Sequence, residues 1–299
     1  MNKKPKVIVI CGPTASGKTG LAIELAKKIN GEIISSDSMQ IYKDMTIGTA
    51  KPTEEEMQGI KHYLIDFVAP NKRYSVADFQ KDAQKAIKEV LDKGKVPIIV
   101  GGTGLYVDTL IYNIQYPEFE IDIEYRKNLE EMINKHGLEV AYNEAEKIDA
   151  EATKKISKND KKRIMRILEI YHQTGKTKTE LEIESRKIAP PYNYLVYAIN
   201  MDREKLYDRI NQRVDIMINQ GLIEEVQHLL KKYKNFPTAM QGLGYKEVAE
   251  YLQGELTKEE MIEKLKRETR KYAKRQLTWF RKNKEIKWID GLLPKEENI

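Results

Sequence analysis

Cysteine, histidine and long apolar runs are scarce in this sequence. Its 299 residues include one cysteine, Cys11, and four histidines. A single cysteine excludes an intramolecular disulfide framework and a multi-cysteine zinc site, and the scattered histidines lack metal-ligand spacing. No stretch approaches the roughly 18 consecutive apolar residues of a membrane-spanning helix. The first apolar run, residues 7–11, is too short for a signal peptide. We therefore expect a cytoplasmic protein that does not contact a membrane.

The composition is that of a globular protein. Hydrophobic residues make up 40% of the chain and charged residues 33%, which leaves enough apolar mass for a core beneath a highly charged surface. A chain of 299 residues forms one large domain, or a main domain that carries a smaller one.

Charge is unevenly distributed along the chain. The formal net charge is +6, but residues 154–178 and 258–287 each carry a net +7, so the remainder is acidic. Two basic segments on an acidic body favour a polyanionic partner, with nucleic acid as the leading candidate. Two solvated helix faces are the alternative. Tyr272, Trp279 and Phe280 lie among the later basic residues. Such rings suit unstacked nucleotides, although some of them must belong to the core.

The first part of the chain alternates between apolar runs and helical patterns. The patterns predict strands at residues 6–10, 33–37, 63–67 and 96–100, and helices at 18–29 and 76–91, with Gly31 stopping the first helix. Continuously apolar strands separated by helices indicate an α/β fold with a parallel sheet covered on both faces. Ligands then bind beyond the carboxyl ends of the strands.

Residues 118–190 differ from this pattern. They contain charged helical patterns at 122–135, 139–147 and 161–173, and end in Ala189-Pro190-Pro191. A strand at 195–199 resumes the earlier alternation, and helices follow at about 203–232, 245–252 and 258–283. We therefore predict a helical insertion domain, residues 118–190, within an α/β core formed by residues 1–117 and 191–299.

The strongest local signal is a phosphate-binding loop. Residues 12–19, Gly-Pro-Thr-Ala-Ser-Gly-Lys-Thr, fit G-x-x-x-x-G-K-[ST] between a predicted strand and a predicted helix. Backbone N–H groups at the helix start can surround phosphate oxygens. Lys18 can neutralise the terminal phosphates, and the Thr19 hydroxyl can ligate Mg²⁺. The loop specifies a di- or triphosphate but not the reaction.

Two acids and one threonine later in the sequence allow more than one interpretation. Asp66 and Asp37 each follow an apolar run, so either could organise Mg²⁺ and water. The serines around Asp37 also suit a helix N-cap or a turn. Thr103, within Gly101-Gly102-Thr103-Gly104, could equally cap the next helix. His62, before the apolar run at 63–67, is expected to be structural.

An ordered series of motifs then becomes recognisable as a whole. The phosphate loop is followed by Ser36-Asp37-Ser38-Met39-Gln40 with Tyr42, Gly48-Thr49-Ala50-Lys51-Pro52, His62-Tyr63-Leu64-Ile65-Asp66, Gly101-Gly102-Thr103-Gly104-Leu105-Tyr106, Asn159-Asp160 with Arg163 and Arg166, Gly242-Leu243-Gly244-Tyr245, and Lys274-Arg275-Gln276 with Trp279. From about residue 7 to 288 the chain resembles the tRNA dimethylallyltransferase family. It ends soon after Trp288 without further cysteines, as the bacterial type does.

The resemblance implies prenyl transfer to N6 of the adenine just 3′ of the anticodon, with dimethylallyl diphosphate as donor and Mg²⁺ as cofactor. Asp37 would be the general base, Thr103 would hydrogen-bond at the reacting centre, and Arg213 would contact the diphosphate opposite Lys18. The residues implied to bind the diphosphate are Gly12, Thr14, Ala15, Ser16, Gly17, Lys18, Thr19 and Arg213. Those implied to meet tRNA are Asp37, Ser38, Met39, Gln40, Thr103, Arg126, Arg163, Arg166, Gln241, Gly242, Gly244, Tyr245, Lys246, Lys274, Arg275, Gln276, Trp279 and Arg281.

These roles agree with what the residues can do physically. A carboxylate can take the proton of a poorly nucleophilic exocyclic amine, and cations stabilise a departing diphosphate. The target base must leave its stack, which requires stacking groups and a basic rim. A small-molecule or nucleoside kinase on the same scaffold is the first alternative, and an RNA-binding module with a vestigial loop is the second. We also expect a monomer.

Overall fold

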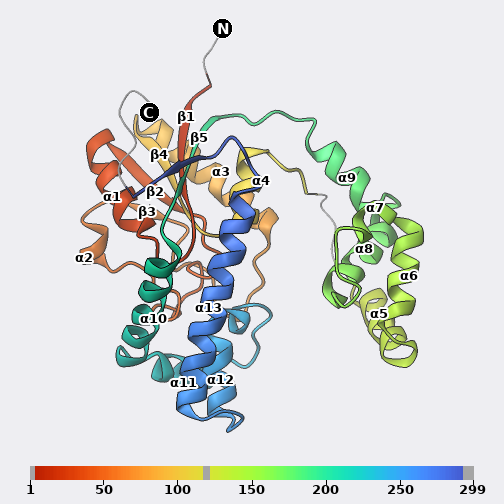
Figure 1. The fold of residues 1–299 in the computed structure, drawn as a ribbon. Coiled ribbons are helices and arrows are strands. Elements are labelled where there is room, and N and C mark those ends of the chain that lie inside the picture. The colour runs from red at the N-terminus through yellow and green to blue at the C-terminus, as the bar shows by residue number, and fades with distance from the viewer. Residues whose placement is uncertain (1–3, 117–121, 292–299) are drawn as a thin grey trace. The chain divides into compact units, whose positions relative to one another are not determined.

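The computed structural model describes residues 4–116 and 122–291. The chain divides into two compact units, one formed by Met1–Ile111 with Pro191–Ile299 and the other by Tyr112–Pro190 (Figure 1). Within the described residues, every helix is too short or too polar to cross a lipid bilayer.

The first unit is built on a six-stranded parallel sheet, which confirms the predicted α/β fold. The strands are β1 (Lys6–Cys11), β2 (Gly31–Ser35), β3 (His62–Tyr63), β4 (Val96–Gly101), β5 (Asn193–Ile199) and β6 (Lys287–Ile289), in the order β3-β2-β4-β1-β5-β6. β1 lies between β4 and β5, with Ile8 opposite Ile98 and Leu195. Because both faces are buried, the central strands β1 and β4 are almost entirely apolar.

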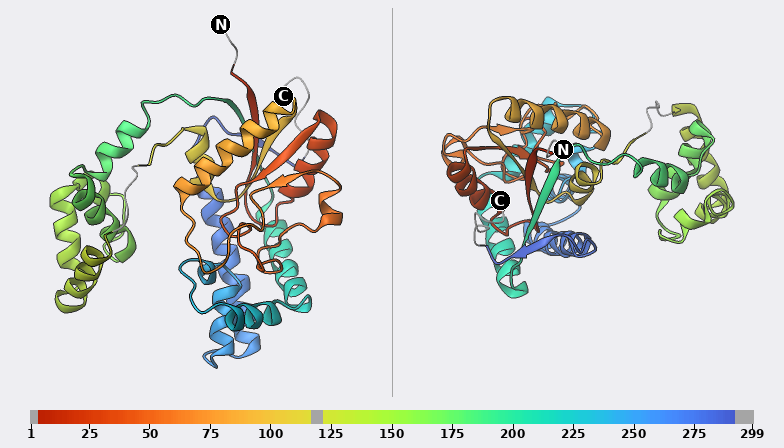
Figure 2. Two further views of the ribbon diagram at one scale, coloured as in Figure 1. Left: turned by 180° about the vertical axis from the view of Figure 1, so that it is seen from behind. Right: turned by 90° about the horizontal axis from the view of Figure 1, so that it is seen from above.

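Helices cover the two faces of this sheet. α1 (Lys18–Ile29) packs on one face, where Ile8, Ile10 and Leu25 share a buried cluster. α3 (Val76–Asp92) and α4 (Gly104–Ile111) cover the other face, around Val9 and Phe79. Figure 2 shows α3 over the face that is seen from behind. Because successive side chains along a strand point to opposite faces of the sheet, the strands contribute residues to both buried clusters.

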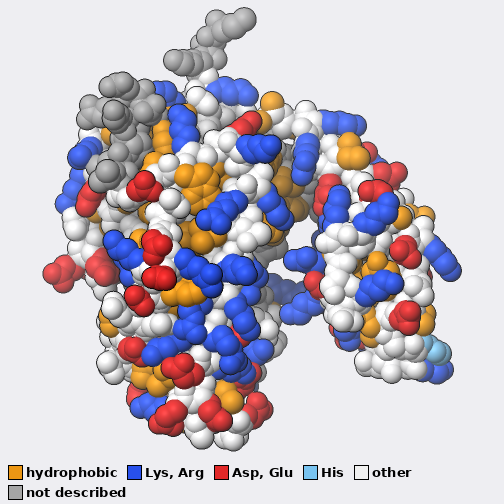
Figure 3. Space-filling model, in the orientation of Figure 1, with side chains coloured by type: hydrophobic (Ala, Val, Ile, Leu, Met, Phe, Trp, Pro, Cys, Tyr) orange, Lys and Arg blue, Asp and Glu red, His pale blue; other side chains and the backbone are white. Residues whose placement is uncertain are grey.

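The C-terminal helices form a further layer beyond the carboxyl ends of the strands (Figure 1). They are α10 (Arg203–Asn219), α11 (Leu222–Lys232), a 3₁₀ turn (Ala239–Gln241), α12 (Tyr245–Leu252) and α13 (Lys258–Phe280), while the four-residue α2 (Glu54–Met57) precedes β3. Leu206 and Ile210 of α10 and Ala273 of α13 are buried against Ala15 of the phosphate loop. Lysine and arginine side chains gather along α13 (Figure 3).

The second unit is a bundle of α-helices. It contains α5 (Ile123–His136), α6 (Leu138–Ile148), α7 (Ala150–Thr153), α8 (Lys161–Thr174) and α9 (Lys178–Ser185). Leu129, Ala141, Tyr142, Ile164 and Leu168 lie in its buried core. This unit therefore has a hydrophobic core of its own.

Three predicted boundaries are wrong for local reasons. Gly31 does not stop α1, because Asn30 adopts the left-handed conformation there (φ 53°) and Gly31 begins β2. A Cβ at Gly31 would lie 2.7 Å from Ile98 Cδ1, so close strand packing explains the glycine. The helix predicted at 203–232 is divided by Gly221, whose φ is 99°. The strand predicted at 63–67 ends at Tyr63 because Leu64 and Asp66 have φ values of 61° and 59°.

Candidate active site

The phosphate loop is held in place by a glutamine from the far end of the chain. Thr14 N donates to Gln276 Oε1 over 2.8 Å, and Gln276 Nε2 donates to the Gly102 carbonyl over 2.9 Å. One α13 side chain therefore links the phosphate loop to the loop after β4. Gln276 is buried, so although the resemblance implies a tRNA contact, its amide serves the loops of the site.

Backbone geometry explains the small residues of the loop. Gly12 and Gly17 have φ values of 140° and 90°, and a Cβ at Gly12 would lie 3.3 Å from Ile199 N. Ala15 has a φ of 63° and packs beneath α10 and α13. The Ser16 hydroxyl is buried and has no hydrogen-bond partner in the described part of the chain. These features leave the start of α1 open to a ligand.

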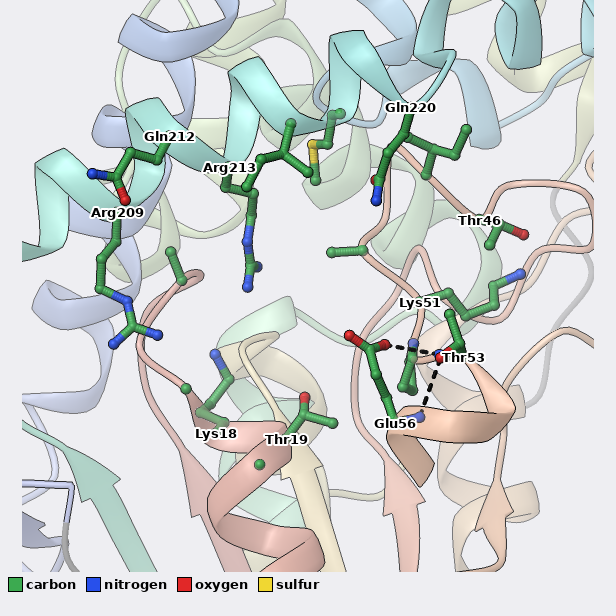
Figure 4. A pocket seen from close by; sticks show the side chains of 18 of the residues that line it. Lys18, Thr19, Thr46, Lys51, Thr53, Glu56, Arg209, Gln212, Arg213 and Gln220 are labelled. Carbon is green, nitrogen blue, oxygen red and sulfur yellow. Dashed lines mark hydrogen bonds between the residues drawn. The ribbon is translucent and has the colours of Figure 1, made fainter. Parts of the chain in front are cut away.

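Two cavities meet at the start of α1. The larger has a volume of about 700 Å³, and the smaller about 100 Å³. Both are lined by Lys18, Thr19 and Arg213, together with Ala50 and Pro52. Figure 4 shows Arg209 and Arg213 extending from α10 toward Lys18 across the larger cavity. The residues that the sequence associated with a diphosphate therefore come together in space.

The electrostatics at this junction favour an anion. Burial, followed by the charge of Arg213, lowers the pKa of Lys18 to about 8, although the charge of Asp37 partly opposes both effects. Burial also lowers the pKa of Arg213, with Arg209 as the next cause. Within the described ranges neither arginine has an ion-pair partner. Clustered cations that lack a protein anion stabilise a multiply charged ligand.

Asp37 forms a turn that lines the smaller cavity. Its Oδ1 accepts hydrogen bonds from Met39 N (2.9 Å) and Gln40 N (3.3 Å), which makes it a turn aspartate. No hydrogen bond within residues 4–116 and 122–291 reaches its Oδ2. Asp37 nevertheless lines the cavity together with Lys18 and Arg213. The turn thus fixes one carboxylate oxygen and leaves the other available.

Thr103 positions the loop that carries Ser38. Its Oγ1 accepts from Ser38 N over 3.1 Å and donates to Ser38 Oγ over 3.3 Å. Thr103 also stands directly before α4, as the sequence allowed, and its carbonyl accepts from Tyr106 N over 2.9 Å. Its hydroxyl bonds Ser38. Gln40 is similarly engaged, since its Nε2 donates to the carbonyls of Thr49 and Ala50 over 3.2 Å.

Two titratable residues that line the smaller cavity, Tyr272 and His62, were missed as site residues. Tyr272 of α13 lies there, and burial, followed by the charge of Asp37, raises its pKa. Its spacing of four residues from Gln276 places both on one face of α13 and could have revealed it. His62 Nδ1 donates to the Ile60 carbonyl over 2.8 Å, as expected of a structural histidine. Its buried Nε2 has no partner among the described residues, and burial lowers its pKa, which favours the neutral ring.

Asp66 does not take part in this site. It forms an ion pair with Lys51 and lines neither cavity, so the interpretation of Asp66 as an organiser of Mg²⁺ is wrong. In the parts of the chain that the structure describes, no three His, Cys, Asp or Glu side chains gather to hold a metal. This lining suits a metal that takes few protein ligands and completes its coordination with water and substrate oxygens.

Exposed groups along α13 and α12 form a basic surface with one aromatic ring. Trp279 packs over Gly104, where a Cβ would lie 2.4 Å from Cδ1 of the indole. Its Nε1 donates to Asp108 Oδ2 over 2.9 Å, so the ring is held at a fixed angle while 37% of it stays exposed. The exposed residues of the predicted tRNA-binding set in this unit are Gln241, Lys246, Lys274, Arg275, Trp279 and Arg281.

Other members of that set are buried. Tyr245 is fully buried, and its hydroxyl donates to Glu225 Oε1 over 2.6 Å. A Cβ at Gly242 would lie 2.5 Å from Met39 Cε, and Gly244, at φ 90°, is the residue that precedes α12. The expectation that the Tyr245 ring meets a nucleic acid is therefore corrected, because this ring supports the loop that Glu225 binds.

Three arginines of the second unit form ion pairs with acidic side chains. Glu169 is only 5% exposed and lies 3.6 Å from Arg126 Nη1 and 3.7 Å from Arg166 Nη1. Arg163 pairs with Asp160 over 3.3 Å near the start of α8. A buried acid therefore holds two of the predicted tRNA-binding arginines close together on α5 and α8.

Comparison with known proteins supplies the context for this geometry. The IPP transferase family model matches residues 40–283. The tRNA dimethylallyltransferase of Acetivibrio thermocellus is 55% identical over 95% of this chain and 91% of the relative. That of Bacillus cereus is 45% identical over 96% of this chain and 90% of the relative.

Solved structures that resemble this chain come from the same family as these relatives. The tRNA isopentenylpyrophosphate transferase of Bacillus halodurans superposes with a TM-score of 0.72 at 44% identity, over 96% of this chain and 90% of that one. A eukaryotic dimethylallyltransferase acting on tRNA superposes with a TM-score of 0.81 at 34% identity, over 96% of this chain and 74% of that one. Together with the phosphate loop and the cavity that joins it to Asp37, these likenesses show that the chain belongs to the tRNA dimethylallyltransferase family.

Proposed function

We propose that the chain modifies tRNA by transferring a dimethylallyl group from dimethylallyl diphosphate to N6 of the adenine 3′ of the anticodon, releasing pyrophosphate. The observation that carries this proposal is the smaller cavity, which is lined by the cations Lys18 and Arg213 and also by the carboxylate of Asp37. Cations suit the diphosphate, and a carboxylate with a free oxygen suits an amine that must lose a proton.

Lys18 and Arg213 bind and stabilise the leaving group. The diphosphate lies at the N-terminus of α1, with its charge facing Lys18 and Arg213. Negative charge grows on the diphosphate as its C–O bond to the dimethylallyl group breaks. Preorganised cations and N–H groups stabilise that charge more strongly in the transition state than in the ground state.

Asp37 activates the adenine amine. N6 forms a bond to the carbon whose C–O bond to the diphosphate breaks, and the N6 proton passes to Oδ2 of Asp37. The hydrogen bonds from Met39 N and Gln40 N to Oδ1 hold the carboxylate in place for this transfer. Ser38 and Met39, on the same turn, contact the flipped base, and Thr103 positions that turn through Ser38.

Mg²⁺ is the proposed metal, held by the Thr19 hydroxyl and the diphosphate oxygens. Thr19 fits this role because it lines both cavities beside Lys18, and because Mg²⁺ commonly takes few protein ligands besides substrate phosphates. When bound, the ion neutralises part of the charge on the leaving diphosphate.

The basic surfaces bind the anticodon stem-loop. Exposed Lys274, Arg275 and Arg281 supply phosphate contacts, and the fixed indole of Trp279 supplies a stacking surface. We assign the same partner to Arg126, Arg163 and Arg166 of the helical insertion, residues 118–190.

A transfer assay tests the proposal. Unmodified tRNA with adenine 3′ of the anticodon is incubated with Mg²⁺ and labelled dimethylallyl diphosphate, with a parallel reaction that contains ATP. Label is expected on the tRNA only with the prenyl donor. Phosphate loss from ATP without prenyl transfer would instead establish the kinase alternative.

A further inference from the structure

We propose that Glu225 is a positioning residue for the transfer reaction, because its carboxylate holds a segment, residues 46–50, that lines both cavities. Glu225 belongs to α11 and lines neither cavity, so it acts through this segment and does not touch a substrate. The inference rests on the proposed function and adds to it a residue that lies outside the site.

Four hydrogen bonds converge on the Glu225 carboxylate. Oε2 accepts from Thr46 N over 2.9 Å and from Ile47 N over 2.8 Å. Oε1 accepts from Gly48 N over 3.1 Å and from the Tyr245 hydroxyl over 2.6 Å. Hydrogen bonds to a carboxylate are roughly twice as strong as those between neutral groups. One side chain therefore fixes three successive N–H groups of the segment.

The segment that Glu225 holds contributes residues to both cavities. Thr46 and Ile47 line the larger cavity. Thr49 lines the smaller one, and Ala50 lines both. Residues 46–50 lie outside the helices and strands, and the bond from Ala50 N to the Ile47 carbonyl, over 3.0 Å, closes their turn. That bond shapes the turn but does not place it relative to α10 and α11, whereas the bonds to Glu225 do.

The same segment holds the turn of Asp37. The carbonyls of Thr49 and Ala50 each accept from Gln40 Nε2 over 3.2 Å. Gln40 N in turn donates to Asp37 Oδ1 over 3.3 Å. Because Gln40 Oε1 accepts from the Ser35 hydroxyl over 3.2 Å, the Gln40 amide is held at both ends. A displacement of the segment would therefore reach the carboxylate that is proposed to take the proton.

Glu225 also ties the segment to the helix that carries Arg213. Leu222 of α11 and Val214 of α10 belong to one buried cluster, so core packing holds the two helices together. Arg213 lines both cavities, and Figure 4 shows its side chain and that of Thr46 at the larger one. A donor that binds at Arg213 therefore meets a segment whose place is already set.

Glu225→Gln tests the inference, because it keeps the shape of the side chain and removes its charge. The amide has one acceptor oxygen, and its NH₂ group would face N–H donors. We expect kcat to fall and the donor KM to rise, with kcat/KM for the donor reduced about 100-fold, the cost of a misplacement of about 1 Å. Affinity for tRNA should stay at the wild-type value, because phosphate contacts dominate it. Folded enzyme is counted by stoichiometric tRNA binding, and kcat is given per folded molecule.

Glu224→Gln is the matched control. It makes the same chemical change one residue earlier in the first turn of α11, at an exposed position that lines neither cavity, and should behave as the wild type. Tyr245→Phe is a second, milder variant. It keeps the ring but removes one hydrogen bond to the carboxylate, so we expect kcat/KM for the donor to fall about fivefold, with a higher donor KM.

An unchanged donor KM in folded Glu225→Gln would overturn the inference, because a residue that only stabilises the fold changes the amount of folded enzyme and not its KM. If Glu225→Gln does not fold, Tyr245→Phe decides: a raised donor KM supports the inference, and a wild-type KM overturns it. Transfer by the wild type in the same assay separates these outcomes from failure of the proposed function, in which the wild type itself would not transfer the group.

Discussion

The arginines and lysines of the two units are arranged in opposite ways. In the first unit Lys18, Arg209 and Arg213 meet at a cavity, and burial lowers the pKa of Lys18 and of Arg213. In the second unit Arg126 and Arg166 are paired with Glu169, which is buried beneath them. The first arrangement demands a ligand of high charge density. The second is already compensated, so we expect it to contribute only modestly to the proposed binding of a large polyanion.

The largest effect that separates the two arrangements should come from Lys18→Ala. This change removes a cation from the departing diphosphate, and losing one such preorganised group costs about 10²–10³ in kcat. We expect a loss of that size in steady-state transfer, with tRNA affinity unchanged in a filter-binding assay. Lys28→Ala, an exposed lysine on the same helix, is the control and should retain full activity. Equal losses from the two variants would mean that Lys18 acts through the helix and not through the ligand.

The next largest effect is expected in the pH dependence of kcat/KM for the donor. With a pKa of about 8, Lys18 is charged below that pH and becomes neutral above it, so donor binding is strongest on the acidic side. We expect kcat/KM for the donor to fall about tenfold per pH unit above pH 8, as one proton is lost. Binding of tRNA to the second unit should not follow this profile, since arginine stays protonated. A Lys18→Ala variant that keeps the same slope would contradict the assignment.

The smallest effect is expected at Glu169. Glu169→Gln removes the buried charge between Arg126 and Arg166 while keeping its shape. The change frees two half-exposed arginine charges for a polyanion, an effect of up to about 1 kcal/mol, which corresponds to roughly a fivefold fall in KM for tRNA. KM for the donor should not change. Glu130→Gln, an exposed acid that lies 3.7 Å from Arg126, is the control and should leave both constants unaltered.

Local patterns predicted the parts of the fold that depend on near neighbours. α1 spans Lys18–Ile29 and α12 spans Tyr245–Leu252, as the periodicity of the sequence indicated. The phosphate loop was predictable because its function fixes residue types at short spacing. The family resemblance and the α/β fold are likewise confirmed.

Features that depend on distant partners could not be predicted from the sequence. Gln276 binds Thr14 across 262 residues, and no local pattern marks that contact. Left-handed Leu64 and Asp66 end β3 early because contacts with Gln40 and Lys51 stabilise them. The three residues of β6 are too few for a period-two pattern to stand out. The burial of Tyr245 depends on Glu225, which lies on another helix.

The central claim is that one cavity joins the diphosphate site to Asp37, the proposed general base. Asp37→Asn tests this claim most directly. Asparagine keeps the Oδ1 acceptor for Met39 N and Gln40 N, so the turn and the melting temperature should be preserved. Single-turnover transfer of a labelled dimethylallyl group to tRNA should fall by about 10²–10⁴, the range for a lost general base. Donor affinity should stay at the wild-type value. A transfer rate equal to that of the wild type, with the fold intact, would contradict the account.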